Sequence, residues 1–311
     1  MTISICEACG GAFRTLGDSC PDCGEPIPPR EEIRRLPHGV VQQFLEDAEE
    51  FLAASPLRQL ALAFAAGSFI TFGAVLSVAL TTDVESVGLS RLLLGLGFAA
   101  GFIIVILSGS ALFTEINVIL PELFLSRPRD LCRRCWSFWG ITIVGNVLGA
   151  LFVGSMISGA HVFGSLQEER LFELMDEKMQ FKEMGTEGWF IVLVSGIVGN
   201  WLVGMAAFLA TAGRTLSGKI LGVIPPIVMF VAIGAQHSPA NLGYFSIGLI
   251  GGGSGFGWGE VIWWNLVPAA LGNILGGAIF VALLFWYTYG HHPKQRESLK
   301  RAHQLVREKR R

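Results

Sequence analysis

The long apolar segments constrain this chain more than any other feature of the sequence. A membrane-spanning helix needs about 20 predominantly apolar residues. The segments that meet this requirement are 59–82, 91–125, 134–160, 188–212, 219–250 and 261–289. Only 15% of the residues are charged, against about 25% in an ordinary soluble domain. The sequence therefore predicts an all-α polytopic membrane protein. Its net charge of −2 argues against a nucleic-acid-binding surface.

The second and fifth of these segments are too long for one straight crossing. Each is interrupted by polar and helix-breaking residues, at 108–115 and 234–241. The motif Gly145-Asn146-Val147-Leu148-Gly149 of the third segment returns as Gly272-Asn273-Ile274-Leu275-Gly276 in the sixth. Three crossings per half is an odd number, so the halves must have opposite topology. We expect six transmembrane helices in a 3+3 inverted repeat, with helices 2 and 5 broken around a permeation site.

Loop charges predict the orientation. If the termini and the even-numbered loops share one side, that side holds 19 of the 23 Lys and Arg residues. By the positive-inside rule both termini are cytoplasmic, in a multi-pass protein of the cytoplasmic membrane. The basic tail, 291–311, is then most simply an anchor at anionic membrane lipids.

Four cysteines near the N-terminus form two CxxC pairs, Cys6 with Cys9 and Cys20 with Cys23. Such pairs surround one tetrahedral ion, and a unit this small folds only on its metal. We expect a zinc-ribbon-like unit over residues 1–26, with structural zinc rather than iron and with disulfides as the alternative. A cytoplasmic partner protein could bind it. A later pair, Cys132 and Cys135, has no second pair and is interpreted as ordinary helix residues.

Residues 27–58 predict a linker followed by an amphipathic helix. Its apolar positions recur at helical spacing between acidic residues: Val40, Val41, Phe44, Leu45, Ala48, Phe51 and Leu52. Such a helix lies along the membrane surface or packs beneath the bundle. Residues 59–290 would form the transmembrane domain.

The two broken segments carry a family resemblance. The run 218–222 followed by Phe230–Leu242, which contains Gln236-His237-Ser238-Pro239, resembles the fifth-helix signature of the formate/nitrite transporter family. Asn265-Leu266-Val267-Pro268 with Gly272–Gly277 resembles its sixth-helix signature, and Leu112-Phe113-Thr114 its second-helix break. The resemblance implies an aquaporin-like protomer, a homopentamer and passage of small monovalent anions. No enzyme motif competes with it.

His237 is the central candidate for a residue that lines the passage. Ionisable residues within a membrane span cost free energy, so they usually have a function there. The alternative is a neutral histidine satisfied by neighbouring carbonyls. The resemblance implies that Thr114 and Asn273 are hydrogen-bonding partners of this histidine. Asn273 and its repeat mate Asn146 could instead join helices. Lys219 matches a family lysine that would attract anions. Phe72, Phe98, Leu112 and Phe208 are candidate gate residues.

A comparison of free energies suggests what the histidine does. Moving a bare carboxylate into an apolar constriction costs on the order of 20 kcal/mol by idealised estimates, and several after relaxation. Protonating a carboxylate of pKa near 4 at pH 7 costs about 4 kcal/mol. The anion would therefore cross as a neutral acid or a strongly hydrogen-bonded species, assisted by His237.

Two departures from the family pattern affect this mechanism. Gln236 stands where the family usually has an acidic residue, and the acid beside a break, Glu115, lies in the other half. The leading function is a channel or transporter for formate, nitrite or a similar anion. Alternatives are a pore for a neutral solute such as hydrogen sulfide or ammonia, and a zinc-ribbon sensor with a vestigial pore.

Overall fold

The computed structural model describes residues 3–5, 12–14, 34–126 and 132–290, and the chain divides into two compact units, Met1–Ile33 and Arg34–Arg311. In the first unit, strands β1 (Ile3–Ile5) and β2 (Ala12–Arg14) pair antiparallel, with Ile3 opposite Arg14. The predicted zinc ligands Cys6, Cys9, Cys20 and Cys23 lie outside the described residues. Within the described ranges, no group of three or more His, Cys, Asp or Glu side chains could hold a metal ion.

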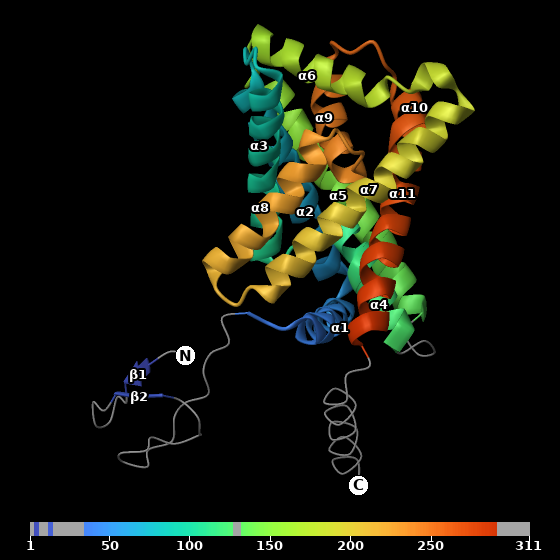
Figure 1. The fold of residues 1–311 in the computed structure, drawn as a ribbon. Helices are drawn as coiled ribbons and strands as arrows, with labels where there is room; N and C mark the ends of the chain where they lie inside the picture. The colour runs from blue at the N-terminus through green and yellow to red at the C-terminus, as the bar shows by residue number, and fades with distance from the viewer. Residues whose placement is uncertain (1–2, 6–11, 15–33, 127–131, 291–311) are drawn as a thin grey trace. The chain divides into compact units, whose positions relative to one another are not determined.

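The second unit is helical. Its elements are α1 (Pro37–Ala53), α2 (Pro56–Thr81), α3 (Val87–Ser108), α4 (Phe113–Ser126), α5 (Cys132–Gly159), α6 (Ser165–Met179), η1 (Lys182–Met184), α7 (Thr186–Ala212), α8 (Leu216–Ala232), α9 (Ser238–Gly251), α10 (Trp258–Val261), η2 (Ile262–Leu266), α11 (Val267–Gly277), η3 (Ala278–Leu283) and α12 (Leu284–Tyr289). Elements α10 to α12 follow one another without a gap (Figure 1).

Among the described residues, five helical stretches are long and apolar enough to span a membrane: Pro56–Thr81, Val87–Ser108, Arg133–Gly159, Thr186–Ala212 and Trp258–Tyr289. The remaining predicted segment, 219–250, is divided into the shorter apolar helix α8 and the helix α9. The chain is therefore a multi-pass membrane protein.

Both predicted interruptions are present. Helix α3 ends at Ser108 and α4 begins at Phe113, while α8 ends at Ala232 and α9 begins at Ser238. A glycine with positive φ follows each first helix, Gly109 at 66° and Gly234 at 74°. Glycine adopts this left-handed conformation without the steric cost of a Cβ atom. The chain therefore turns at each break without strain.

The repeated Gly-Asn-x-Leu-Gly motif lies where helices approach most closely. Helix α5 packs against α2, and α11 packs against α7. A Cβ atom on Gly149 would lie 2.1 Å from the Phe64 carbonyl oxygen, and one on Gly276 would lie 2.3 Å from that of Ile197. Small residues allow such close approach of membrane helices. The motif thus sets the distance between helices in both places.

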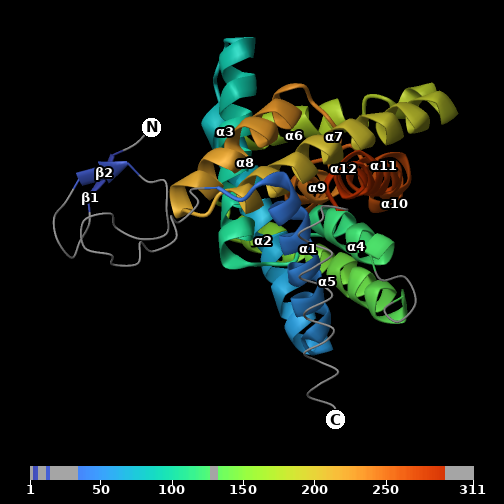
Figure 2. The same ribbon diagram turned by 60° about the horizontal axis from the view of Figure 1, so that its bottom comes forward.

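Helix α1 closes one end of this unit. Its apolar face packs against α4, α7 and α12, and the rings of Phe44 and Phe208 lie 6.2 Å apart. Figure 2 turns this end forward and shows α1 beside α2 and α4. Of the two predicted positions for the amphipathic helix, the structure supports packing beneath the bundle. Cys135 is buried in the same apolar cluster, in agreement with its interpretation as a helix residue.

Helix α6 lies at the opposite end, at the top of Figure 1. It is amphipathic, and its buried residues are Leu171, Leu174, Met175 and Met179. Arg91 of α3 forms an ion pair with Glu177 of α6 at 2.9 Å. Helix α3 therefore runs from the α6 end, near Arg91, to the α1 end, near Ser108.

Candidate functional site

The second break holds His237 in the interior. Its side chain is fully buried, and the residue caps α9, where its Nδ1 accepts a hydrogen bond from the Ala240 N–H at 3.3 Å. Its Nε2 lies 2.9 Å from Oγ1 of Thr114, the second residue of α4. Because Nδ1 is an acceptor, the network assigns the proton of a neutral ring to Nε2, which then donates to Thr114. The two broken segments thus meet at this bond.

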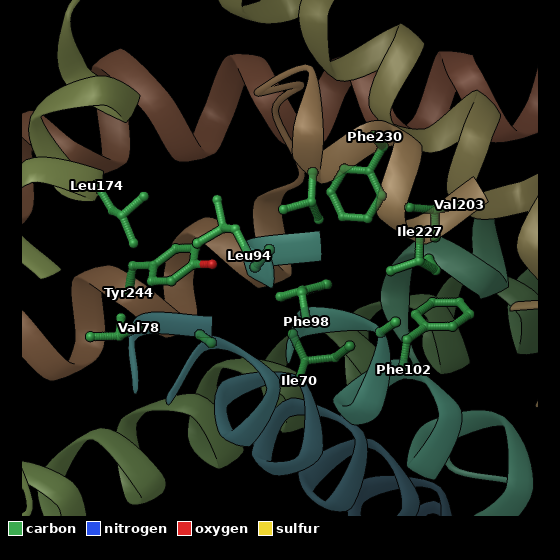
Figure 3. Packing of buried hydrophobic residues seen from close by; sticks show 14 of the residues in the cluster. Ile70, Val78, Leu94, Phe98, Phe102, Leu174, Val203, Ile227, Phe230 and Tyr244 are labelled. Carbon is green, nitrogen blue, oxygen red and sulfur yellow. The ribbon is translucent and has the colours of Figure 1, made fainter. Parts of the chain in front are cut away.

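Aromatic rings enclose the histidine. The ring centroids of Phe98 and Phe230 lie 6.2 and 5.3 Å from that of His237 and 5.6 Å from each other. Phe102 and Leu112 are also fully buried. Figure 3 shows Phe98, Phe102 and Phe230 among the apolar side chains of this cluster. We call these four apolar residues, with His237 and Thr114, the central layer.

Two of the predicted gate residues lie elsewhere. Phe208 packs between Phe44 and Phe285 in the cluster under α1, and Phe72 is 46% exposed on the outer face. Phe230 was not predicted, because many phenylalanines occur in these apolar helices and spacing alone does not distinguish them.

Asn273 holds the two sides of the second break together. Its Nδ2 donates to the carbonyl oxygens of Gly196 and Gln236 at 2.9 and 3.1 Å. Its Oδ1 accepts from the backbone N–H and the hydroxyl of Ser238 at 2.8 and 2.9 Å. All the hydrogen-bonding groups of this amide are used. Asn273 thus bonds to the residues on either side of His237.

Asn146 makes the matching bonds at the first break. Its Nδ2 donates to the carbonyl oxygens of Ala63 and Ala111 at 2.8 and 3.0 Å, and its Oδ1 accepts from the Phe113 N–H at 2.8 Å. Each asparagine therefore bonds to three places: a neighbouring helix, the next-to-last residue of the break (Ala111 or Gln236), and the first residue of the following helix. We call this arrangement the asparagine clamp.

Gln236 belongs to a buried amide network on the α6 side of His237. Its Oε1 accepts from the Nδ2 atoms of Asn241 and Asn265 at 2.7 and 3.2 Å. Asn265 also donates to the Lys178 carbonyl oxygen at 2.8 Å. The residue that departs from the family pattern thus accepts two hydrogen bonds without carrying a charge.

A narrow cavity of about 20 Å³ lies on the α6 side of the central layer. Phe98, Phe230 and Lys178 line it. The Lys178 ammonium is within 3.4 and 3.3 Å of the carbonyl oxygens of Gly234 and Ala235. Burial lowers its pKa to about 8, against the opposing effect of Glu177. The sequence pattern did not single out this lysine.

A larger cavity of about 340 Å³ lies on the α1 side, and we call it the α1-side vestibule. It is lined by the ends of α3 and α7, by α1, and by the first break. Its charged residues are Asp47, Glu50, Arg58, Glu115 and Lys219. The predicted anion-attracting lysine, Lys219, therefore lines a cavity next to the central layer.

Along α3, Phe98 lines the first cavity and Val105 the second. Val105 is seven positions after Phe98 in the helix, which corresponds to a rise of about 10 Å. The buried Phe102 lies in between. Two cavities that approach a thin, closed layer from opposite ends define a class of protein, the membrane-embedded passage for small solutes.

Comparison with known proteins identifies the family. The formate/nitrite transporter family profile matches residues 38–287. A probable formate transporter of Methanothermobacter thermautotrophicus is 34% identical over 254 residues, which cover 77% of this chain and 92% of that protein. The formate channel FocA of Escherichia coli K12 is 30% identical over 257 residues, or 75% and 87% of the two chains. The chain belongs to the formate/nitrite transporter family, as predicted, and these relatives are transporters and channels rather than enzymes.

Solved structures agree on the fold. An FNT family ion channel aligns with a TM-score of 0.71 at 23% identity, over 80% of this chain and 98% of the other. A pentameric formate channel with formate bound aligns with a TM-score of 0.63 at 23% identity, over 75% and 97%.

Proposed function

We propose that this protein is a channel or transporter for small monovalent weak-acid anions, with formate as the first substrate to test and nitrite as the second. The names of the relatives support formate. The observation that carries the proposal is the His237–Thr114 hydrogen bond inside the closed central layer, with a cavity on each side. Lys178 and Lys219 line those cavities and would concentrate anions at both mouths.

In the proposed mechanism His237 acts as a hydrogen-bond donor. Its Nδ1 accepts from the Ala240 N–H, at the N-terminus of α9, so a second ring proton there would face another donor. The Nε2–H is the group that a passing carboxylate or carboxylic acid could accept from, by displacing Thr114. The solute crosses the aromatic part of the layer as a neutral acid or as a hydrogen-bonded anion.

The proposed topology is six crossings in a 3+3 inverted repeat, with α3–α4 and α8–α9 as the broken crossings. The matched asparagine clamps support the repeat. The distribution of Lys and Arg supports cytoplasmic termini, so the α1 side would face the cytoplasm. We further propose a homopentamer, by analogy with the pentameric formate channel of similar fold.

Proteoliposome uptake of radiolabelled formate and nitrite tests the function. The wild-type protein should give saturable uptake, and H237A should lower it by roughly 10- to 100-fold, the loss expected for a hydrogen bond to a charged group. T114V, which removes the acceptor but keeps the shape, should affect uptake less. Wild-type liposomes that take up ammonia or hydrogen sulfide but neither anion would favour a neutral-solute pore. H237A uptake equal to wild type would contradict the mechanism.

We propose that the N-terminal cysteines bind structural zinc. The antiparallel pairing of β1 and β2 supports this, because Cys6 and Cys9 belong to the segment that joins the two strands. Metal analysis of the purified protein should give about one zinc per chain, and C20S should lose it. If C20S also loses a co-purifying protein while formate uptake is unchanged, the unit binds a partner. Full zinc content in C20S would contradict the site.

A further inference from the structure

Glu115 occupies an unusual place for an acidic residue. It follows Thr114 directly in the first turn of α4, so it is one residue from the hydrogen bond of the central layer. Its side chain lines the α1-side vestibule. Among the described residues, no side chain forms an ion pair or hydrogen bond with its carboxyl group. A carboxyl group without a fixed partner beside a cavity is free to exchange its proton.

The charged groups around Glu115 favour proton exchange over a structural ion pair. Asp47 and Glu50 face the vestibule from α1, Arg58 from α2 and Lys219 from α8; α3, α7 and the break contribute neutral groups such as Ser108, Ser110 and Thr211. Asp47 and Glu115 line the same vestibule, and burial raises the pKa of Asp47. Two carboxyl groups that influence each other do not both ionise easily.

The other groups of the passage do not replace this one. Gln236 carries no ionisable proton, and its Oε1 is bonded to Asn241 and Asn265. His237 has its Nδ1 occupied by the Ala240 N–H, so its neutral ring provides a hydrogen bond but no net proton. On the α1 side, Glu115 is therefore the vestibule carboxyl group that adjoins Thr114 of the central layer, where a carboxylate that must become neutral could take up a proton.

We propose that Glu115, assisted by Asp47, is the proton-exchanging residue of the α1-side vestibule. A protonated Glu115 gives its proton to an arriving carboxylate, which enters the central layer as the neutral acid and leaves Glu115 ionised. Ionised Glu115 then takes up a proton from the solution on the α1 side through the water of the vestibule, so one proton accompanies each carboxylate that crosses. In the opposite direction, ionised Glu115 accepts the proton of the arriving acid and releases it to water. This inference rests on the proposed function.

The test is the pH dependence of formate uptake into proteoliposomes that contain a pH-sensitive dye. If protons come only from bulk water, the neutral fraction of formate falls about tenfold per pH unit above its pKa. Wild-type uptake should fall much less than tenfold between pH 6 and pH 7, because Glu115 supplies the proton. E115Q should show the full tenfold fall, while its uptake at pH 5 stays near that of wild type.

E122Q is the matched control. Glu122 is a buried carboxylic acid on the same helix, but it is not among the residues that line the vestibule. Its pH profile should equal that of wild type. D47N should shift in the direction of E115Q by a smaller factor, and it decides the question if E115Q does not fold.

The outcomes separate the two proposals. If the wild-type protein takes up formate and the pH profiles of both E115Q and D47N equal the wild-type profile, the role of Glu115 is overturned and the proposed function stands. A wild-type protein that carries no weak-acid anion at any pH overturns both. An E122Q profile that changes as much as E115Q would also overturn the inference, because position on the vestibule would then not matter.

Discussion

The two breaks share one construction and differ in what they present to the passage. In both, an asparagine of the repeated motif bonds to a neighbouring helix, to the last part of the break and to the start of the next helix. The second break then provides the imidazole of His237. At the matching place, directly before the clamped N–H of Phe113, the first break provides the apolar side chain of Leu112.

The cavities beside the two breaks also differ, in volume and in charged residues. The first break opens to a vestibule of about 340 Å³ that contains two cations and three carboxyl groups. The cavity beside the second break has about 20 Å³, and its charged lining residues are the half-buried Lys178, Arg91 and Glu177. The comparison indicates that the two breaks share the asparagine clamp. The residues within each break, such as His237 or Leu112, and the residues that line the cavity beside it determine which hydrogen bonds and charges the passage offers to a solute. Substitutions in the asparagine clamps should therefore destabilise the protein to a similar extent at both breaks. Substitutions of the residues that line the cavities should act differently at the two breaks.

The largest expected effect comes from the helix contacts of the repeated motif. G149A and G276A would place a Cβ atom 2.1 and 2.3 Å from backbone carbonyl oxygens. Overpacking in a core costs about 1–3 kcal/mol and occasionally more, and a backbone neighbour cannot move aside as a side chain can. Both variants should lose most of the folded protein in detergent thermal-denaturation and gel-filtration assays.

G140A provides the control, on the same helix as Gly149. A Cβ atom on Gly140 would have no described atom of another helix within 4 Å. This variant should fold at least as well as wild type, since alanine favours a helix by about 0.5–1 kcal/mol over glycine. If G149A were harmful and G276A harmless, the shared architecture of the two halves would be refuted.

The next largest effect should come from the clamps. N273A removes four hydrogen bonds and N146A removes three. Each leaves buried backbone groups unpaired, at a cost of about 1–3 kcal/mol per group. Both variants should lower the melting temperature by similar amounts. Formate uptake by the surviving protein should fall further in N273A, because only the second break positions His237. Equal uptake in the two variants would contradict that division.

Much of this architecture could be predicted from the sequence. Hydropathy located the spans, and the polar interruptions located both breaks, because such residues cannot continue an apolar helix without cost. The repeated Gly-Asn-x-Leu-Gly motif indicated that the asparagines were important. Its pattern did not show whether they faced the passage or joined helices, since both uses need the same amide at the same spacing. The hydrogen bonds of Asn146 and Asn273 run to neighbouring helices and to the breaks, so in the structure both asparagines join helices.

The Lys178 side of the site was missed for a physical reason. Lys178 lies in a polar, charged segment that resembles a solvent-exposed loop by composition. Its helical spacing from Leu171, Leu174 and Met175 was the available signal, because it places the lysine on the buried face of α6. Asn241 and Asn265 lie within the two signature motifs, but their bonds to Gln236 were not predicted, because a single amide in an apolar helix gives no indication of its partners.

Lys178 gives the third prediction. Burial lowers its pKa to about 8, so its ammonium form is populated below that pH and lost above it. The attraction of anions at the α6-side mouth should disappear in the same range. The ratio of wild-type to K178M formate uptake should be several-fold at pH 7 and approach one at pH 9.

K178R is the matched variant, since arginine stays charged over the whole range. Its uptake relative to K178M should not fall between pH 7 and pH 9. A wild-type ratio that is constant with pH would mean that the lysine charge does not contribute. The α1 side should show no such step in sided assays, because Lys178 is not among the residues of that vestibule.

Q236E should have the smallest effect, and it tests whether the second break needs a charge. The glutamate carboxylate can accept the same two hydrogen bonds from Asn241 and Asn265 that the Gln236 Oε1 accepts now. These two hydrogen bonds and the Lys178 ammonium beside the Ala235 carbonyl should offset part of the cost of burying the charge, so Q236E should lose less stability than Q236A in a melting experiment, and its formate uptake should stay within a few-fold of wild type. Q236A removes the acceptor, leaves two buried amide N–H groups unpaired, and should cost about 1–3 kcal/mol. If Q236E is as unstable as Q236A, the neutrality of this amide is what the network requires. The second break would then exclude a carboxylate, whereas the α1-side vestibule beside the first break contains the carboxyl group of Glu115.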